Sequence, residues 1–268
     1  MLGEASHWQE YYDRRRTQDN MTGIEVTPLG QDDVHVRIAS LDCRQSERSF
    51  FESILAEDEI NRANRFHFQQ DRERFIAGRG LLRIILSSYV GVPPGEIIFV
   101  YGSRGKPKLR RQDGRPAIEF NLAHSDGTAI YAITQDRPVG VDIELVTDKF
   151  PVESVAAHFF SRIEVAALRS LPKDMQRIAF FKCWTRKEAF IKALGDGLSC
   201  PLSDFDVSVT PGQPARLLHV RWAPEEASRW CMEDIESVPN CAGAIVFSGP
   251  QCRMHVSQWI LNSGTGMN

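Results

Sequence analysis

Two acidic side chains, Asp142 and Glu144, stand two positions apart in the stretch VGVDIE. Side chains alternate between the two faces of a β-strand, so both carboxylates project from one face while Val139, Val141 and Ile143 point to the other. Paired carboxylates in a partly enclosed place repel each other, and a hard divalent metal ion is one way to hold them together. A solvated strand face is the commoner setting for such a pair, so this stretch alone leaves both interpretations open.

A second group of residues that could do chemistry lies in FFKCWTRKEAFIKAL, residues 180–194, which we expect to be helical. Trp184, Glu188 and Lys192 are spaced four residues apart and therefore lie on one face of that helix. They could form an ordinary surface pair beside a half-buried tryptophan, worth about 0.3 kcal/mol. They could instead supply a third carboxylate and a phosphate-binding lysine beside the strand that bears the first two acids.

A lysine and a histidine accompany these acids in the sequence. Lys106 lies in a Gly-Lys-Pro turn, which is either solvated or a rigid turn that presents a cation to a phosphate. His124 stands next to the end of the stretch FNLAHS, and such a histidine is more often structural than catalytic. It stands at the end of an expected strand between small residues, however, where an imidazole could reach a ligand.

An arginine-rich stretch, residues 71–90, has the apolar spacing of an amphipathic helix. A basic helix of this kind is usually a solvated face, and that is the simpler interpretation of its four arginines. Gly78 and Gly80 lower its helix propensity, which indicates close packing or the close approach of a ligand.

The bulk composition excludes several classes of protein. The chain has 268 residues, of which 42% are hydrophobic and 25% charged, as is ordinary for a globular protein with one large or two small domains. A net charge of −3 gives no reason to expect nucleic-acid binding. The six cysteines include no C-x-x-C pair, which argues against a structural zinc site or a disulfide framework and favours a reducing cytoplasm. We see no secretory signal and no apolar run of membrane-spanning length.

The order of the elements predicts an α+β fold in two similar halves that join near residues 135–150. Strands are expected at residues 34–39, 96–101, 118–122, 128–134, 139–144, 205–209, 215–221, 230–235, 242–247 and 255–259, and helices at 47–55, 56–70, 71–90, 152–160, 162–170 and 174–194. The strand 139–144 is expected to form a hairpin with 128–134. Ser161 and Glu164 have the spacing of a helix capping box. We divide the chain into a polar N-terminal extension (1–24), an N-terminal subdomain (25–138) and a C-terminal subdomain (139–268).

Taken together and in this order, the motifs resemble those of the 4'-phosphopantetheinyl transferases of the longer, monomeric, surfactin-synthetase-activating (Sfp) type. The resemblance covers roughly residues 34–250. The matching motifs are RFIAGRGLLR (74–83), GKP (105–107), FNLAHS (120–125), VGVDIE (139–144), FFS-x-x-E (159–164) and W-x-x-KEA-x-x-K (184–192).

The resemblance implies a monomeric α+β protein built as a pseudo-twofold pair of similar α/β subdomains, with the active site in the cleft between them. It implies an enzyme, a holo-[acyl-carrier-protein] synthase. Such an enzyme transfers 4'-phosphopantetheine from coenzyme A to a serine of an apo acyl or peptidyl carrier protein, with Mg²⁺ or Mn²⁺, and releases 3',5'-adenosine bisphosphate. Carriers of fatty acid, polyketide and nonribosomal peptide synthases all receive this modification, so the resemblance does not choose among them.

The resemblance also implies roles for single residues. Three acids match the family's metal ligands: Asp142, Glu144 and Glu188. Three residues match its phosphate contacts: Lys106, His124 and Lys192. Arg62 and Arg74 occupy the basic positions for the 3'-phosphate and adenine end of coenzyme A, and Glu164 matches a motif acid that is less clearly catalytic. The pattern departs at Arg186, where relatives carry Met or Val, and we expect this to affect packing more than chemistry.

Chemistry gives roles to the same residues. A serine hydroxyl is a poor nucleophile, so a base must take its proton, and Glu188 is the first candidate, directly or through a metal-bound water. Lys192, one turn further on, could stabilise the transferring phosphoryl group. Two other functions would use similar residues: a non-catalytic module that binds coenzyme A or carrier proteins, and a metal-dependent phosphohydrolase. The intact acids argue against the first, and the lack of an acid-rich or His-rich two-metal cluster argues against the second.

Overall fold

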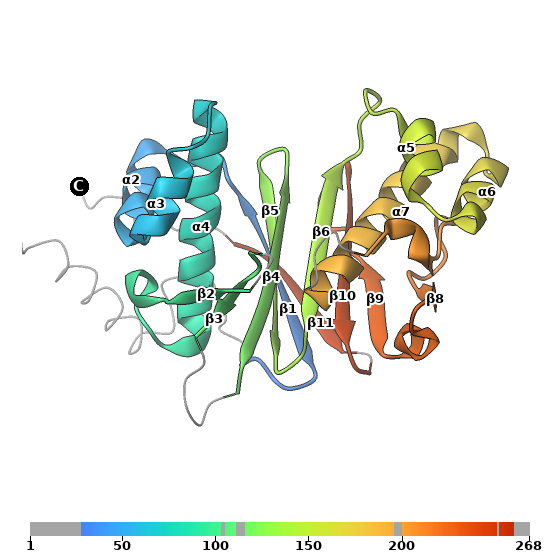
Figure 1. Cartoon of the computed structure of the whole chain (residues 1–268). Coiled ribbons are helices and arrows are strands. Elements are labelled where there is room, and N and C mark those ends of the chain that lie inside the picture. The colour runs from blue at the N-terminus through green and yellow to red at the C-terminus, as the bar shows by residue number, and fades with distance from the viewer. Residues whose placement is uncertain (1–27, 103–104, 111–115, 196–199, 251, 260–268) are drawn as a thin grey trace, which may run out of the picture. The chain divides into compact units, whose positions relative to one another are not determined.

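The computed structural model describes residues 28–102, 105–110, 116–195, 200–250 and 252–259, and residues 29–258 form one compact unit. The expected extension, residues 1–24, lies outside the described residues. None of the described helices is long and apolar enough to cross a membrane. The α+β class expected from the sequence is confirmed, because two separate sheets are each covered by helices (Figure 1).

The first sheet carries the helices of the N-terminal half. Its strands, in order across the sheet, are β11 (Arg253–Gln258), β1 (Asp33–Ser40), β5 (Thr128–Gln135) and β4 (Ile118–Ser125). All neighbours are antiparallel except β1 and β11, so the last strand of the chain returns to pair with the first. The helices are α2 (Gln45–Ile54), α3 (Glu57–Ala63) and α4 (Gln69–Val90), and Figure 1 shows α4 running along this sheet with α2 and α3 beside it. A short ribbon, β2 (Phe99–Tyr101) and β3 (Pro107–Leu109), follows the 3-10 turn Pro94–Glu96.

The second sheet belongs to the C-terminal half. Its strands, in order, are β6 (Val139–Leu145), β10 (Cys241–Ser248) and β9 (Trp230–Asp234), all antiparallel. The long helix α7 (Lys173–Leu194) packs on it, and α5 (Val152–Phe159) and α6 (Arg162–Ser170) lie beside α7 (Figure 1). The ribbon β7 (Phe205–Val207) and β8 (Leu217–Val220) and the 3-10 turns Leu202–Asp204 and Pro224–Ser228 complete this half.

An apolar layer lies between the two sheets and joins the halves. Val34, Val36 and Ile38 of β1 share one buried cluster with Val141 and Ile143 of β6. The alternation that predicted these strands therefore also selects the faces that meet. A second buried cluster fills the space between α7 and the C-terminal strands.

The expected hairpin between residues 128–134 and 139–144 is wrong. β5 pairs with β1 and β4, whereas β6 pairs with β10 in the other sheet. The chain turns through Asp136, whose φ is +53°, and crosses from one sheet to the next, because β6 buries its valines in the layer between the sheets. The hairpin of this region is instead β4–β5, whose turn uses Asp126 and Gly127 at positive φ.

Two expectations about the arginine-rich region are also corrected. The expected helix 56–70 ends at Ala63, and α4 begins at Gln69. Not all arginines of α4 are solvated, because Arg79 and Arg83 are buried and both bind the buried Glu59 of α3, at 2.6 and 2.7 Å. Gly80 is explained by close packing, since a Cβ atom there would overlap the ring of Phe51 on α2.

Candidate active site

Strand β6 presents its acids to helix α7. Gly140, Asp142 and Glu144 share the face opposite the apolar layer. A Cβ atom at Gly140 would overlap the backbone of α7 at Ala189 and Ala193. A glycine is therefore needed here for α7 to lie directly on the strand, and this close approach brings the last turns of α7 beside the acids.

Asp142 is the most enclosed of the three acids. Its side chain is 7% exposed, and its Oδ1 accepts a hydrogen bond from Lys192 Nζ at 2.7 Å. Its other oxygen, Oδ2, is buried and has no hydrogen-bond partner among the described residues. Burial raises the pKa of this carboxyl, and the opposing effects of Lys192 and of the Ile143 amide do not cancel that rise. The sequence predicted only that Lys192 lies near the strand that bears Asp142. The structure shows a direct ion pair between the two side chains.

Glu188 and Glu144 are half-buried beside Asp142. Burial raises the pKa of Glu188, and the negative charges of Asp142 and Glu144 raise it further while Lys192 lowers it. Burial and the Asp142 charge likewise raise the pKa of Glu144, which accepts a 3.3 Å hydrogen bond from Ser125 Oγ. Asp142 therefore lies near enough to disfavour the ionised forms of Glu144 and Glu188, as happens where acids are assembled for a cation.

These residues fit a hard divalent cation. Carboxylate oxygens are the ligands that Mg²⁺ prefers, and the buried Oδ2 of Asp142 lacks any other partner among the described residues. The oxygens of Asp142, Glu144 and Glu188 do not all come within 4.8 Å of one another, since among the described residues only a different group of three reaches that spacing. The sequence-predicted acids are thus brought to one place, at a spacing wider than that of a closed metal site.

Lys106 lies where the start of β6 meets the end of α7, and its ammonium faces backbone oxygens. Its Nζ donates to the carbonyl of Val139 at 3.1 Å and to that of Lys192 at 2.6 Å. It therefore ties the turn before β3 to the start of β6 and to the end of α7, where helix carbonyls lack intrahelical partners. Burial lowers the pKa of Lys106 to about 8, and the charges of Lys108 and Lys192 contribute to that shift.

The remaining predicted cations lie on the N-terminal half. His124, at the end of β4, is exposed, and its pKa is lowered by desolvation of the ring and by the charges of Lys192 and Arg74. Arg74 of α4 binds Asp42 through Nε at 3.0 Å. Arg62 of α3 is exposed, with its guanidinium 5.5 Å from the centre of the Phe75 ring. Lys192 and Arg74 thus lie near enough to His124 to affect its ring, and Arg62 is not among the charges that do so.

Two buried ion pairs that the sequence did not predict hold helix α7 in place. Glu164 is 1% exposed; it closes the capping box with Ser161 and also binds the buried Lys187 at 2.8 Å. Arg186 is fully buried and binds Asp234 of β9 through two hydrogen bonds of 2.8 and 2.7 Å. The KEA lysine and the FFS-x-x-E acid are therefore structural partners that fix α7 in place, and the capping-box spacing was the one sequence signal of this role.

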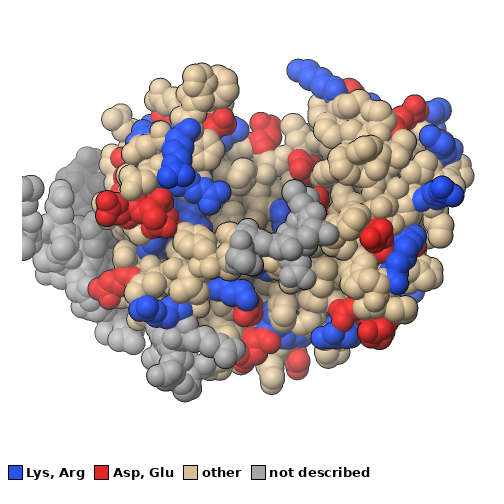
Figure 2. Space-filling view, viewed as in Figure 1, with Lys and Arg blue, Asp and Glu red and all other residues tan. Residues whose placement is uncertain are grey.

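The seam between β4 and β6 is closed by side chains. Asn121 Oδ1 accepts from the Val141 amide at 2.8 Å, and Ser125 Oγ accepts from the Leu145 amide at 3.0 Å. Acids from β6 and α7 and cations from α4, β4 and α7 meet along this seam, and Figure 2 shows Lys and Arg side chains interspersed with acidic ones on both halves. Such an arrangement can hold a cation and a polyphosphate together and place a carboxylate base beside them.

Comparison with known proteins covers both halves of the chain. Residues 138–246 match the 4'-phosphopantetheinyl transferase superfamily, and residues 42–135 match the family "4'-phosphopantetheinyl transferase, N-terminal". The chain is 39% identical over 221 residues to the 4'-phosphopantetheinyl transferase HetI of Nostoc sp., a match that covers 82% of this chain and 90% of that protein. It is 34% identical over 163 residues to the 4'-phosphopantetheinyl transferase Sfp of Bacillus subtilis, covering 61% and 70%. The L-aminoadipate-semialdehyde dehydrogenase-phosphopantetheinyl transferase of Xenopus laevis is 32% identical over 163 residues, covering 58% and 54%.

Proposed function

The chain belongs to the 4'-phosphopantetheinyl transferase family, and on that premise we propose the reaction in detail. It transfers the 4'-phosphopantetheine group of coenzyme A to a serine of an apo acyl or peptidyl carrier protein and releases 3',5'-adenosine bisphosphate. The observation that supports this most directly is the Asp142–Lys192 contact of 2.7 Å, with a buried carboxylate oxygen left without a described partner. A cation-binding acid and a phosphate-binding lysine are then one unit at the seam of the two halves.

We propose Mg²⁺ as the metal ion, with Mn²⁺ as a substitute. Asp142 and Glu188 would hold it, and Glu144 would reach it directly or through water. When bound, the ion supplies positive charge that neutralises the pyrophosphate and the leaving phosphate. The raised pKa values of all three acids indicate that negative charge is costly at this place, so a cation that offsets it would also stabilise the fold.

The chain's own residues bind and orient coenzyme A and take the proton of the carrier serine. We propose that Glu188 takes the proton from the carrier serine hydroxyl, directly or through a metal-bound water. Lys192 places its ammonium beside the transferring phosphoryl group, and His124 contacts the pyrophosphate. Arg62 and Arg74 bind the 3'-phosphate and adenine end. Lys106 contacts a phosphate by exchanging a backbone carbonyl for a phosphate oxygen.

We propose that the protein acts as a monomer in the cytoplasm, with carrier proteins and coenzyme A as its partners and without nucleic acid or a membrane. Five cysteines are free thiols, which suits a reducing compartment: Cys43, Cys183, Cys231, Cys241 and Cys252. Carrier proteins of this kind are generally acidic helical bundles, so the exposed arginines of residues 62–83, without the buried Arg79 and Arg83, are a suitable part of their binding surface.

The proposal is tested with a panel of apo carrier domains, coenzyme A and Mg²⁺, read by mass spectrometry of the carrier. We expect a gain of one phosphopantetheine group, lost with a chelator and restored by Mg²⁺. Metal-dependent coenzyme A binding without any transfer across the panel would indicate a binding module instead. Release of free phosphopantetheine without a carrier would indicate a hydrolase.

A further inference from the structure

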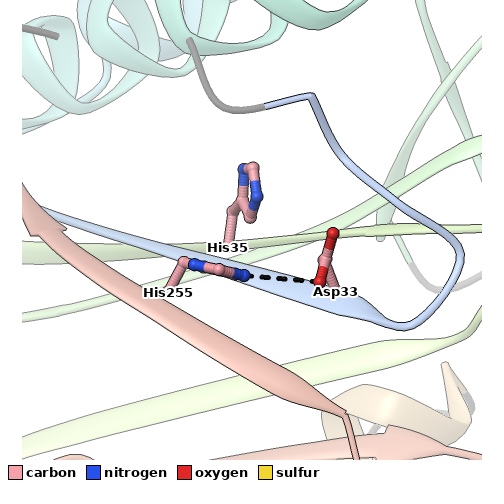
Figure 3. A group of neighbouring side chains, drawn as sticks. All are labelled: Asp33, His35 and His255. Carbon is pink, nitrogen blue, oxygen red and sulfur yellow. Dashed lines mark hydrogen bonds and ion pairs between the residues drawn. The ribbon is translucent and has the colours of Figure 1, made fainter. Parts of the chain in front are cut away.

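A group of metal-ligating side chains lies outside the candidate active site, between the first and last strands. Asp33 and His35 of β1 share a face, and His35 is the register partner of His255 on the parallel strand β11. One ligand atom from each of the three residues lies within 4.8 Å of the other two. Figure 3 shows the three side chains converging from the two strands, with His255 Nε2 3.3 Å from Asp33 Oδ1.

One atom of this group is buried without a partner. His35 is 0% exposed, and its Nε2 has no hydrogen-bond partner among the described residues. An unsatisfied buried polar atom destabilises a fold, so a native protein normally supplies it with a ligand, ion or water. His35 therefore gives a reason, beyond the composition of the group, to expect something bound there.

The other nitrogen of His35 is already oriented. Its Nδ1 lies 2.8 Å from the Tyr89 hydroxyl of α4 and 3.0 Å from Arg37 Nη2. For Nε2 to bind a metal, the ring proton must be on Nδ1, where the Tyr89 oxygen can accept it. This requires Arg37 Nη2 to give up the hydrogen bond that it now donates to Nδ1, while Arg37 Nη1 keeps its contacts to Ser257 Oγ at 3.0 Å and to the His255 carbonyl. A metal-bound histidine is typically held in this way by a hydrogen bond from its second nitrogen.

An ion can reach this group from solvent, and the Arg253 side chain that now binds Asp33 can move away. The His255 side chain is 40% exposed, so the group opens to solvent on the β11 side. Asp33 now binds Arg253 at 3.0 Å, but the Arg253 side chain is 75% exposed and can turn into water. The Arg253 end of this ion pair is solvated, so a metal ion can take its place on the buried Asp33 carboxylate.

We propose that Asp33, His35 and His255 bind a divalent transition-metal ion of the zinc type, which ties the last strand of the sheet to the first. Two imidazoles and a carboxylate are a common three-residue ligand set for zinc, with a fourth position left for water. The site is independent of the three acids of the active site, which share no residue with it. Its effect is on the stability of the β1–β11 pair.

The test uses the full chain, stripped with a chelator and then kept in excess Mg²⁺ so that the active-site acids are filled. Co²⁺, a spectroscopic substitute for Zn²⁺, is titrated and followed by visible absorption, and Zn²⁺ is then used to displace it. We expect one Co²⁺ per chain with a nitrogen and oxygen ligand spectrum, tighter at higher pH because binding releases protons. Transferase activity is measured alongside and should not depend on this ion.

Three variants make the result decisive. His255→Gln, at a half-exposed position that leaves the buried ligands in place, should lower the affinity by about tenfold or more. Tyr89→Phe should also lower it, whereas the matched control His219→Gln, at another exposed histidine near an aspartate, should not. The proposal is overturned if wild-type protein binds no Co²⁺ or Zn²⁺, if His255→Gln binds as tightly as wild type, or if the spectrum shows thiolate bands from a cysteine.

Discussion

Replacing Asp142 by Asn should remove activity with little cost in stability. Two effects on the free energy of unfolding oppose each other in this variant. Lys192 loses a charged hydrogen-bond partner at 2.7 Å, worth about 1.5–3 kcal/mol. Against this, burial raises the pKa of Asp142 despite that partner, so the folded state holds the ionised carboxylate less favourably than the unfolded chain does.

The net change in stability is therefore small. Because the folded pKa lies above the unfolded value of 3.8, the ionised carboxylate destabilises the fold at neutral pH, and asparagine removes that burden. Lys192 is 31% exposed, so its freed ammonium can be solvated. We expect the free energy of unfolding, from urea denaturation at pH 7, to fall by less than about 2 kcal/mol or to rise.

The activity should fall by about a hundredfold or more in kcat/KM, as for the loss of a charge that stabilises the transition state. The assay is transfer to an apo carrier protein, read by mass spectrometry at saturating coenzyme A and Mg²⁺. The rise in unfolding temperature that Mg²⁺ gives the wild type should also disappear. A folded Asp142→Asn protein that keeps near-wild-type transfer would refute the role assigned to this acid.

The matched control is Asp206→Asn, at an aspartate with a 3% exposed side chain away from the acids of β6. Burial raises its pKa, but hydrogen bonds from Ser161 and Arg221 outweigh that effect, so its folded pKa lies below 3.8. Its ionised form stabilises the fold at neutral pH, and this contribution is lost as the pH falls through the folded pKa. We expect a loss of about 1–3 kcal/mol with activity retained. If Asp142→Asn cost more stability than Asp206→Asn, the reasoning from their opposite pKa shifts would fail.

Three further predictions concern the same seam. Glu188→Gln should lower kcat by about a hundredfold or more; a folded variant with wild-type kcat would exclude Glu188 as the base. Wild-type stability should rise between about pH 8 and 10.5, because Lys106 loses its proton more easily when folded, and urea midpoints of Lys106→Met should lack this rise. Gly140→Ala should destabilise the fold by more than about 3 kcal/mol through overlap with the α7 backbone, and a variant with a normal urea midpoint would contradict that packing.

Local patterns predicted the elements well because they depend on neighbours in the chain. Alternation identified β1 and β6, and the Ser161–Glu164 spacing identified a real capping box. The same-face spacing of Glu188 and Lys192 on α7 placed both beside the acids, and the Asp142–Lys192 contact follows from that register. Sequence was sufficient wherever the period of an element decides which way a side chain points.

Partners distant in sequence were not predictable in this way. The pairing of β6 with β10 joins segments about a hundred residues apart, while the nearer β5 is an apolar run that looked an equally good partner. Arg79 and Arg83 looked solvated because nothing in α4 itself shows that Glu59 lies buried beside them. Lys106 was expected at a phosphate, and only the fold shows that the end of α7 offers it a carbonyl. Whether a charged side chain is buried, and which group it pairs with, depends on tertiary contacts that a local sequence pattern does not contain.

The position of the acids on β6 follows from how the edge strands β4 and β6 satisfy their backbone hydrogen bonds. β4 and β6 are edge strands of different sheets, and unpaired edges are a liability because their amides can bind another chain. Here the amides of β6 that face β4 bind the side chains of Asn121 and Ser125 instead of a backbone ladder. Side chains can accept hydrogen bonds from these edge amides only where β4 and β6 do not pair as neighbouring strands of one sheet. The two sheets therefore meet at a seam instead of forming one continuous sheet. Ser125 contacts both the β6 backbone and Glu144, so the groups that protect the edge also orient an acid beside it.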